Sequence, residues 1–188
     1  MPINIPPSRP GLRNLFNTLG SDITGFYSEF NDLVDSTLPL HVLLAYVFFR
    51  LEQGQLLALY LGSRKLQRTD SELTWKALDS QRIDRETFLT YFETIYSFPI
   101  PQPIREIIVP AEKIRDRLMH GKIVTDPNLR EAIARPLYYS LEINNLIAQK
   151  INGLRPFVSD LRGVIGRLES LDKPTSRWIL KGMGFQLS

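Results

Sequence analysis

The most apolar part of the chain is the run LHVLLAYVFF, at residues 40–49. A helix that is apolar nearly all round is typical of an element buried on every side. The run therefore predicts the central and most buried helix of the protein, at about residues 38–62. Its uninterrupted apolar part, from Val42 to Phe49, is too short to span a membrane. His41, Arg50 and Glu52 bracket that part, so no membrane partner is expected.

Helices are also predicted on both sides of this run, because apolar residues recur there at spacings of three and four. They cover about residues 11–36, 69–78, 84–96, the segment that ends at Gly121, 127–152, 155–172 and 174–185. The last of them is expected to pin Trp178 and Phe185 on the body of the protein. No strand pattern is visible in the sequence. The sequence therefore predicts an all-α fold.

The length of 188 residues fits a single helical domain at residues 1–188. Within it we expect an extended N-terminal segment at 1–10, because four prolines fall there. A helical bundle is expected at about 11–152, followed by a basic extension of short helices at about 153–188. The first residues lack the basic and apolar regions of a signal peptide, which predicts a cytoplasmic protein.

The composition excludes several kinds of active site. The chain has no cysteine and only two histidines, which excludes a thiol nucleophile and argues against a structural zinc site. No metal or other cofactor is therefore expected. The net charge of +3 permits an anionic partner such as RNA without requiring one. Glycine-rich phosphate loops and the common hydrolase and metalloprotease motifs are missing from the sequence.

The candidate site is the segment IRDRLMHGK, at residues 114–122. An apolar stripe leads into it, so its polar residues are expected to point away from the core. Asp116 lies four residues before His120, on a neighbouring helix position, and its carboxylate is expected to orient the imidazole. Gly121 suits the left-handed residue that closes a helix. We therefore expect His120 at an accessible helix end.

These residue types suit the cleavage of RNA without a metal ion. A histidine can take the proton from a ribose 2′-hydroxyl or give one to the leaving 5′-oxygen. An arginine such as Arg115 can hold the scissile phosphate and the charge that develops on it. Arg117 and Lys122 are weaker candidates for contacts with RNA phosphates.

The arginine, the acid that follows it and the histidine five residues later resemble the R-x(4–6)-H motif of HEPN domains. The resemblance is sharp over residues 114–122 and extends to the rest of the chain only as helical architecture. It implies an antiparallel helical bundle and a metal-independent endoribonuclease of the toxin or defence type. It also implies Arg115 and His120 as catalytic residues, and products with a 2′,3′-cyclic phosphate and a 5′-hydroxyl.

A homodimer is expected if the protein is active. On an ideal helix five residues turn by about 140°, so Arg115 and His120 do not share one face. Two copies related by a two-fold axis can bring both residue types to one cleft. The resemblance implies the same arrangement, because HEPN dimers are built in this way. An antitoxin or another protein partner would fit the same setting.

Other interpretations stay open. The chain is also compatible with a catalytically inactive HEPN-like module that binds RNA, a nucleotide or a protein. A third reading is an unrelated helical interaction protein, with residues 115–117 in ordinary surface ion pairs. The two short helices at 69–78 and 84–96 allow a helix-turn-helix reading, although the turn glycine is missing. His41 is expected as a core or capping histidine, and Asn144 as a buried hydrogen-bonding residue.

Overall fold

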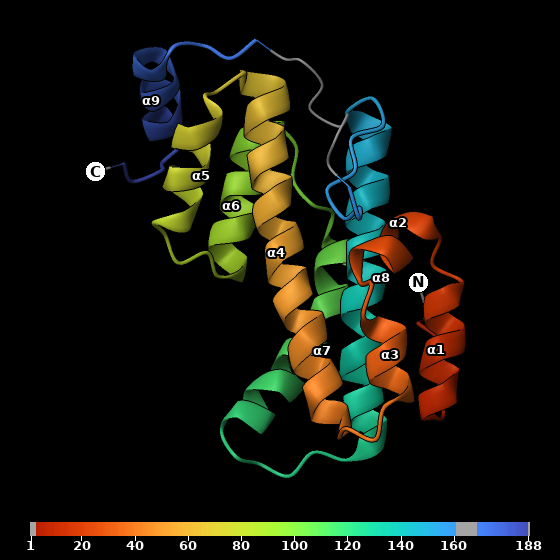
Figure 1. Cartoon of the computed structure of the whole chain (residues 1–188). Coiled ribbons are helices and arrows are strands. Elements are labelled where there is room, and N and C mark those ends of the chain that lie inside the picture. The colour runs from red at the N-terminus through yellow and green to blue at the C-terminus, as the bar shows by residue number, and fades with distance from the viewer. Residues whose placement is uncertain (1–2, 161–168, 188) are drawn as a thin grey trace. The chain divides into compact units, whose positions relative to one another are not determined.

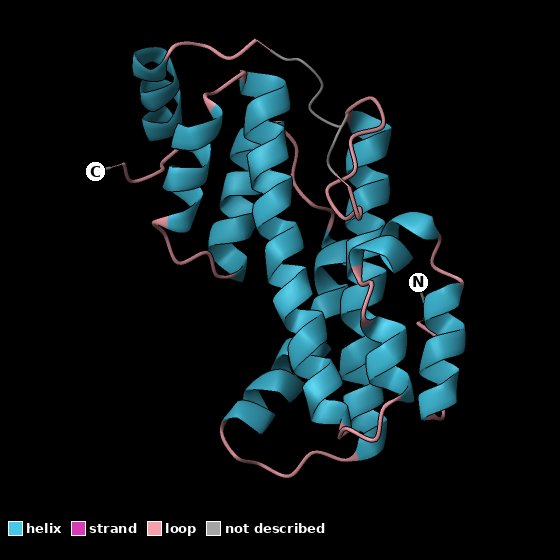
Figure 2. Cartoon of the chain, viewed as in Figure 1, coloured by secondary structure: helices cyan, strands magenta, loops and turns pink. Residues whose placement is uncertain are grey.

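A computed structural model of the chain describes residues 3–160 and 169–187. These residues form nine helices and contain no strand (Figure 2). The prediction of an all-α fold is therefore confirmed.

In chain order the helices are α1 (Arg9–Asn17), α2 (Ser21–Phe26), α3 (Phe30–Asp35), α4 (Leu40–Gln67), α5 (Ser71–Asp79), α6 (Arg85–Tyr96), α7 (Gln102–Met119), α8 (Asp126–Lys150) and α9 (Lys173–Gly182). The three helices nearest the N-terminus are short, and the longest helices are α4 and α8 (Figure 1).

The chain divides into two compact units. The first contains Met1–Gln53 and Pro101–Ser159, and the second contains Gly54–Ile100 and Asp160–Ser188. This division differs from the expected one, because Gly54–Ile100 groups with the C-terminal segment and not with a bundle at 11–152. The boundary lies inside α4, at the polar stretch EQGQ of residues 52–55, and not at a loop.

The first unit is built on α7 and α8, which pack along one another (Figure 1). Two of the three N-terminal helices, α1 and α2, contact α8, and α3 packs on α1. Phe16 of α1 stacks on Phe30 of α3 with ring centroids 4.3 Å apart. The hydroxyls of Tyr27 and Ser140 form a buried hydrogen bond of 2.8 Å. These contacts join segments that lie far apart in the sequence.

The predicted single helix at 11–36 is wrong, because three short helices occupy that segment. The first break comes at Gly20, whose φ of +82° no α-helix accommodates. The second comes at Tyr27, which leaves helical geometry at φ −96° and ψ 50°. The breaks fold the segment back on itself, so that Phe16 and Phe30 stack with ring centroids 4.3 Å apart. On one straight helix, fourteen residues would separate the two rings by about 21 Å.

The prediction for residues 40–49 is only partly correct. The run is helical, and its buried side includes Leu43, Leu44 and Val47. It is not buried all round, because Phe49 is 57 % exposed and His41 is also exposed. Of the two roles expected for His41, in the core or at a cap, its exposure rules out the core. α4 is the one helix in the described part of the chain that is long and apolar enough to cross a membrane, a test that buried core helices also pass.

α4 continues to Gln67, five residues beyond its predicted end at Gly62. Gly62 does not close the helix. A Cβ at this position would lie 2.6 Å from Cγ2 of Ile95 and 2.7 Å from the ring of Tyr96, both on α6. Glycine at this position therefore allows α6 to approach closely the part of α4 that belongs to the second unit.

Caps fix the ends of the other helices in the second unit. The Asp84 carboxylate accepts a hydrogen bond from the Thr87 N–H at 2.9 Å, so Asp84 caps α6. The cap of α5 is Asp70, whose carboxylate accepts from the Leu73 N–H at 3.0 Å. The predicted start of that helix at Thr69 was therefore early by two residues, because α5 begins at Ser71.

The C-terminal segment corrects two further predictions. The predicted helix at 155–172 is absent from its described parts, 155–160 and 169–172, and its remainder lies outside the described residues. The final helix ends at Gly182 and not at residue 185 as predicted, but Phe185, three residues beyond it, is buried against Tyr91 as expected, with ring centroids 4.3 Å apart. Trp178 is 76 % exposed, so it is not pinned on the protein.

Candidate functional site

The candidate segment lies at the C-terminal end of α7, as the sequence predicted. The Gly121 N–H donates to the Leu118 carbonyl at 2.9 Å, and the Lys122 N–H donates to the Arg117 carbonyl at 3.0 Å. With Gly121 at φ +70°, these bonds form a Schellman ending. His120 is the last residue before this turn and is exposed to solvent. The predicted position of His120 at an accessible helix end is therefore confirmed.

Arg115 is held by three contacts from the protein. Its guanidinium lies 3.3 Å from the Glu52 carboxylate and 3.3 Å from the Asp116 carboxylate. It also lies over the ring of Phe48, 4.7 Å from the ring centroid. Glu52 and Phe48 both belong to α4, so this helix fixes the position of the arginine on α7. The Arg115 side chain is 36 % exposed, which leaves part of the guanidinium open to a ligand.

Asp116 does not take the predicted role of orienting His120. Its carboxylate pairs with the guanidinium of Arg115, and the described structure has no hydrogen bond between Asp116 and the His120 imidazole. The backbone does link the two residues, because the His120 N–H donates to the Asp116 carbonyl at 3.0 Å. The structure thus joins Arg115 with Asp116 and leaves the His120 ring to solvent.

Arg117 and Lys122 are both exposed beside this helix end. Each can contact a phosphate that approaches from solvent, although cations are favoured near any helix C-terminus. Two exposed apolar residues flank the histidine: Met119 is 77 % exposed and Ile123 is 91 % exposed. The helix end therefore presents cations, an imidazole and apolar side chains together.

Sequence reasoning missed Glu52 and Phe48. They lie more than sixty residues before Arg115, and no local motif relates the two segments. The only available signal was that Glu52 closes the apolar run of α4 with an exposed carboxylate.

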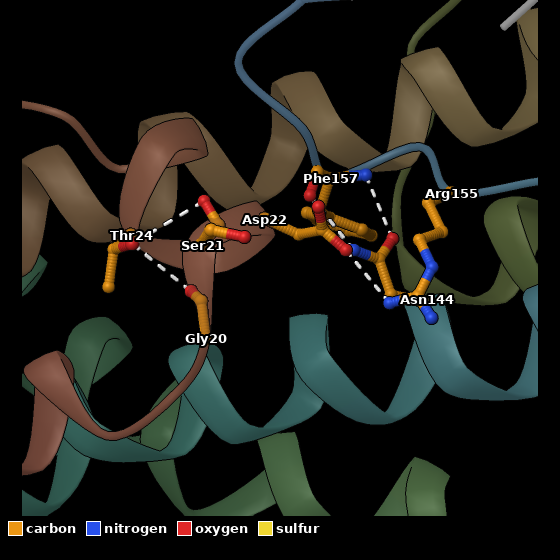
Figure 3. Close-up of polar contacts among 7 residues, drawn as sticks. All are labelled: Gly20, Ser21, Asp22, Thr24, Asn144, Arg155 and Phe157. Atoms are coloured by element: carbon orange, nitrogen blue, oxygen red, sulfur yellow. Dashed lines mark hydrogen bonds and ion pairs between the residues drawn. The ribbon is translucent and has the colours of Figure 1, made fainter.

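A second polar cluster of the first unit is structural (Figure 3). Asn144 bonds the backbone of Phe157 twice, as expected for a buried hydrogen-bonding residue. Nearby, the Arg155 guanidinium pairs with the Asp22 carboxylate at 2.8 Å, and the Thr24 hydroxyl donates to the Gly20 carbonyl at 3.1 Å. Because these groups satisfy one another, the cluster offers no open site.

No set of three or more histidine, cysteine, aspartate or glutamate side chains in the described residues could hold a metal ion.

No family model matches this sequence. Comparisons with curated proteins and with solved structures also gave no match.

Proposed function

We propose that the protein is a HEPN-like, metal-independent endoribonuclease of the toxin or defence type that acts in the cytoplasm. The observation that supports this best is the end of α7. There the His120 imidazole is open to solvent, and the Arg115 guanidinium is positioned little more than one turn earlier by α4.

The proposed reaction starts at the ribose 2′-hydroxyl. His120 acts as a general acid or base: as the base it accepts the hydroxyl proton, and the oxygen attacks the adjacent phosphorus. The bond to the 5′-oxygen breaks, and that oxygen takes up a proton. The products are a 2′,3′-cyclic phosphate and a 5′-hydroxyl. Arg115 binds the phosphate and stabilises the negative charge that develops in the transition state.

The active form in this proposal is a homodimer. Within one helix Arg115 and His120 diverge by about 140°, and a second copy can supply the missing partner across a two-fold axis. The exposed Met119 and Ile123 flank the histidine and would lose solvent contact in such a dimer. Their burial would supply hydrophobic free energy to the association.

The decisive experiment compares the two histidine variants. Purified protein is incubated with mixed cellular RNA, with and without a chelator, and the product ends are analysed. His120→Ala should lower the cleavage rate by about 10²–10⁴-fold. His41→Ala is the matched control, because His41 is also exposed but lies on α4, and it should cleave normally. Cleavage that survives in His120→Ala, or that requires Mg²⁺, would exclude the mechanism.

The contacts of Arg115 favour a second candidate function. Two carboxylates and an aromatic ring already engage the guanidinium, which lowers the gain from binding a phosphate. A catalytically inactive module that binds RNA or a protein, including an antitoxin, would need no free arginine at this position. RNA binding by the wild-type protein without any cleavage would favour this candidate.

A further inference from the structure

The exposed face of α9 carries an unusual combination of side chains. Trp178 is 76 % exposed, although tryptophan is among the residues most often buried in folded proteins. The charged residues of α9 are all basic: Lys173, Arg177 and Lys181, spaced by four along the helix. No acidic residue lies between Lys173 and Gly182. The helix therefore presents one large aromatic ring in a positively charged setting.

Trp178 is not needed to hold α9 in place. The helix is anchored by the buried Leu180 and by Ser176, whose hydroxyl accepts a hydrogen bond from the Asp70 N–H at 2.8 Å. Phe185 stacks on Tyr91 just beyond the helix. Since these contacts fix the helix, the tryptophan is free to contact a ligand.

The neighbouring helix α5 adds a second accessible indole. Trp75 is 39 % exposed, and one of its faces stacks on Tyr60 with ring centroids 4.5 Å apart. α5 packs against α9, and Glu72 of α5 pairs with Lys173 of α9 at 2.6 Å. Both tryptophans of the chain thus belong to two adjoining helices of the second unit.

We infer that α9 binds single-stranded RNA, with a base stacked on Trp178 and a backbone phosphate at Lys181. This inference rests on the proposed function, since it adds a second RNA contact to the one proposed at α7. Bases stack on exposed aromatic rings in single-stranded complexes, and nearby cations bind the phosphates. The uniformly basic charge of α9 is complementary to such a strand.

A membrane surface fits this helix less well. Interfacial helices insert several apolar side chains into the lipid boundary. The exposed positions of α9 other than Trp178 are Lys173, Pro174, Thr175, Lys181 and Gly182, which offer no aliphatic anchor. One exposed aromatic ring, on a helix whose charged residues are all basic, matches a single stacked base.

The test uses tryptophan fluorescence in the full chain. A Trp75→Phe, His120→Ala protein keeps Trp178 as its single tryptophan and should not cleave its ligand. Addition of a short oligouridylate should quench this fluorescence in a saturable, salt-sensitive way. Vesicles of phosphatidylserine and phosphatidylcholine should leave it unchanged. Quenching by the vesicles alone, or no quenching by RNA that the protein binds, would overturn the inference.

A binding series completes the test. In the His120→Ala background, Trp178→Ala should raise the Kd for a labelled oligouridylate by about 5- to 100-fold. Trp178→Phe should recover part of the affinity, which loss of folding would not allow. Phe49→Ala is the matched control, because Phe49 is an exposed aromatic residue of the first unit. Equal affinity in the Trp178→Ala protein would overturn the inference, while cleavage by the wild type tests the proposed function separately.

Discussion

The side-chain amide of Asn144 forms two hydrogen bonds with the backbone of Phe157 (Figure 3). Asn144 Nδ2 donates to the Phe157 carbonyl at 2.8 Å, and its Oδ1 accepts from the Phe157 N–H at 2.9 Å. Both residues are fully buried. The Asn144 amide supplies the hydrogen-bond partners that the backbone of Phe157 would find in a strand or a helix. It therefore holds the segment that follows α8 against α8.

Replacement of Asn144 by Ala should destabilise the protein. The substitution leaves one buried N–H and one buried carbonyl of Phe157 without partners, at a total cost of about 2–4 kcal/mol. The free energy of unfolding in urea measures this loss. Asn145→Ala is the matched control, because Asn145 is the next residue on α8 and is exposed. Its cost should stay below about 0.5 kcal/mol, and equal losses in the two variants would contradict the assigned role of Asn144.

Gly62→Ala should destabilise the protein although alanine favours helices. The new methyl would lie within 3 Å of Ile95 and Tyr96, and forcing them apart costs about 1–3 kcal/mol. This exceeds the gain in helix propensity of up to about 1 kcal/mol. Gly182→Ala provides the contrast, because no atom lies within 4 Å of its added methyl. Thermal unfolding should therefore show a lower Tm for the first variant and an equal or higher Tm for the second.

Substitutions of Arg115 and of Glu52 should change the protein's action on RNA in opposite directions. Arg115→Ala should reduce cleavage by about 10²–10³-fold, because the proposed phosphate contact is lost from the transition state. Arg115→Lys should not restore full activity, since an ammonium group cannot reproduce the planar fork. Glu52→Gln removes a carboxylate that competes with the phosphate, and should tighten RNA binding measured by fluorescence anisotropy. Unchanged binding in Glu52→Gln would show that Arg115 does not contact RNA.

The hydrogen bond between Tyr46 and Glu29 should make the stability of the protein depend on pH in the acid range. The Tyr46 hydroxyl donates to the Glu29 carboxylate at 2.6 Å, and this bond is the main cause that lowers the carboxyl pKa below its ordinary value of 4.5. A lowered pKa in the folded state stabilises the protein above the unfolded-state pKa, and this stabilisation is lost as the pH falls through the folded-state pKa. Tyr46→Phe should therefore flatten the fall in stability below about pH 4.5.

Urea unfolding at neutral pH and at about pH 3 measures this difference. Tyr138→Phe serves as the control, because the structure records no carboxylate contact for the Tyr138 hydroxyl among the described residues. It should retain the acid dependence of the wild-type protein. An equal fall in stability for the wild type and Tyr46→Phe would contradict the assigned pair.

Local signals in the sequence predicted the parts of the fold that depend on neighbouring residues. Asp84 caps α6 through the residue three places on, and Gly121 closes α7 by its own backbone conformation. The position of His120 follows from Gly121 alone. Such features need no knowledge of the rest of the chain.

The remaining features depend on distant contacts. The apolar spacing of residues 11–36 suits one helix. Gly20 permits the first break, but the division into three helices also depends on packing against α8 and within the N-terminal segment. Trp178 was expected inside because of its residue type, whereas other residues anchor α9. The partners of Arg115 come from α4, which no spacing rule relates to residues 114–122.

The bond between Tyr27 and Ser140 has a consequence for the order in which the protein forms during translation. The two residues are separated by 113 positions, and α8 must be complete before the N-terminal helices can pack on it. At a synthesis rate of about 5–20 residues per second, α1 to α3 wait roughly 6–23 s for that surface. During this time Phe26 lacks the ring of Phe157 that finally packs on it, and Tyr27 lacks the Ser140 hydroxyl, so part of the aromatic surface of the N-terminal helices stays exposed to solvent.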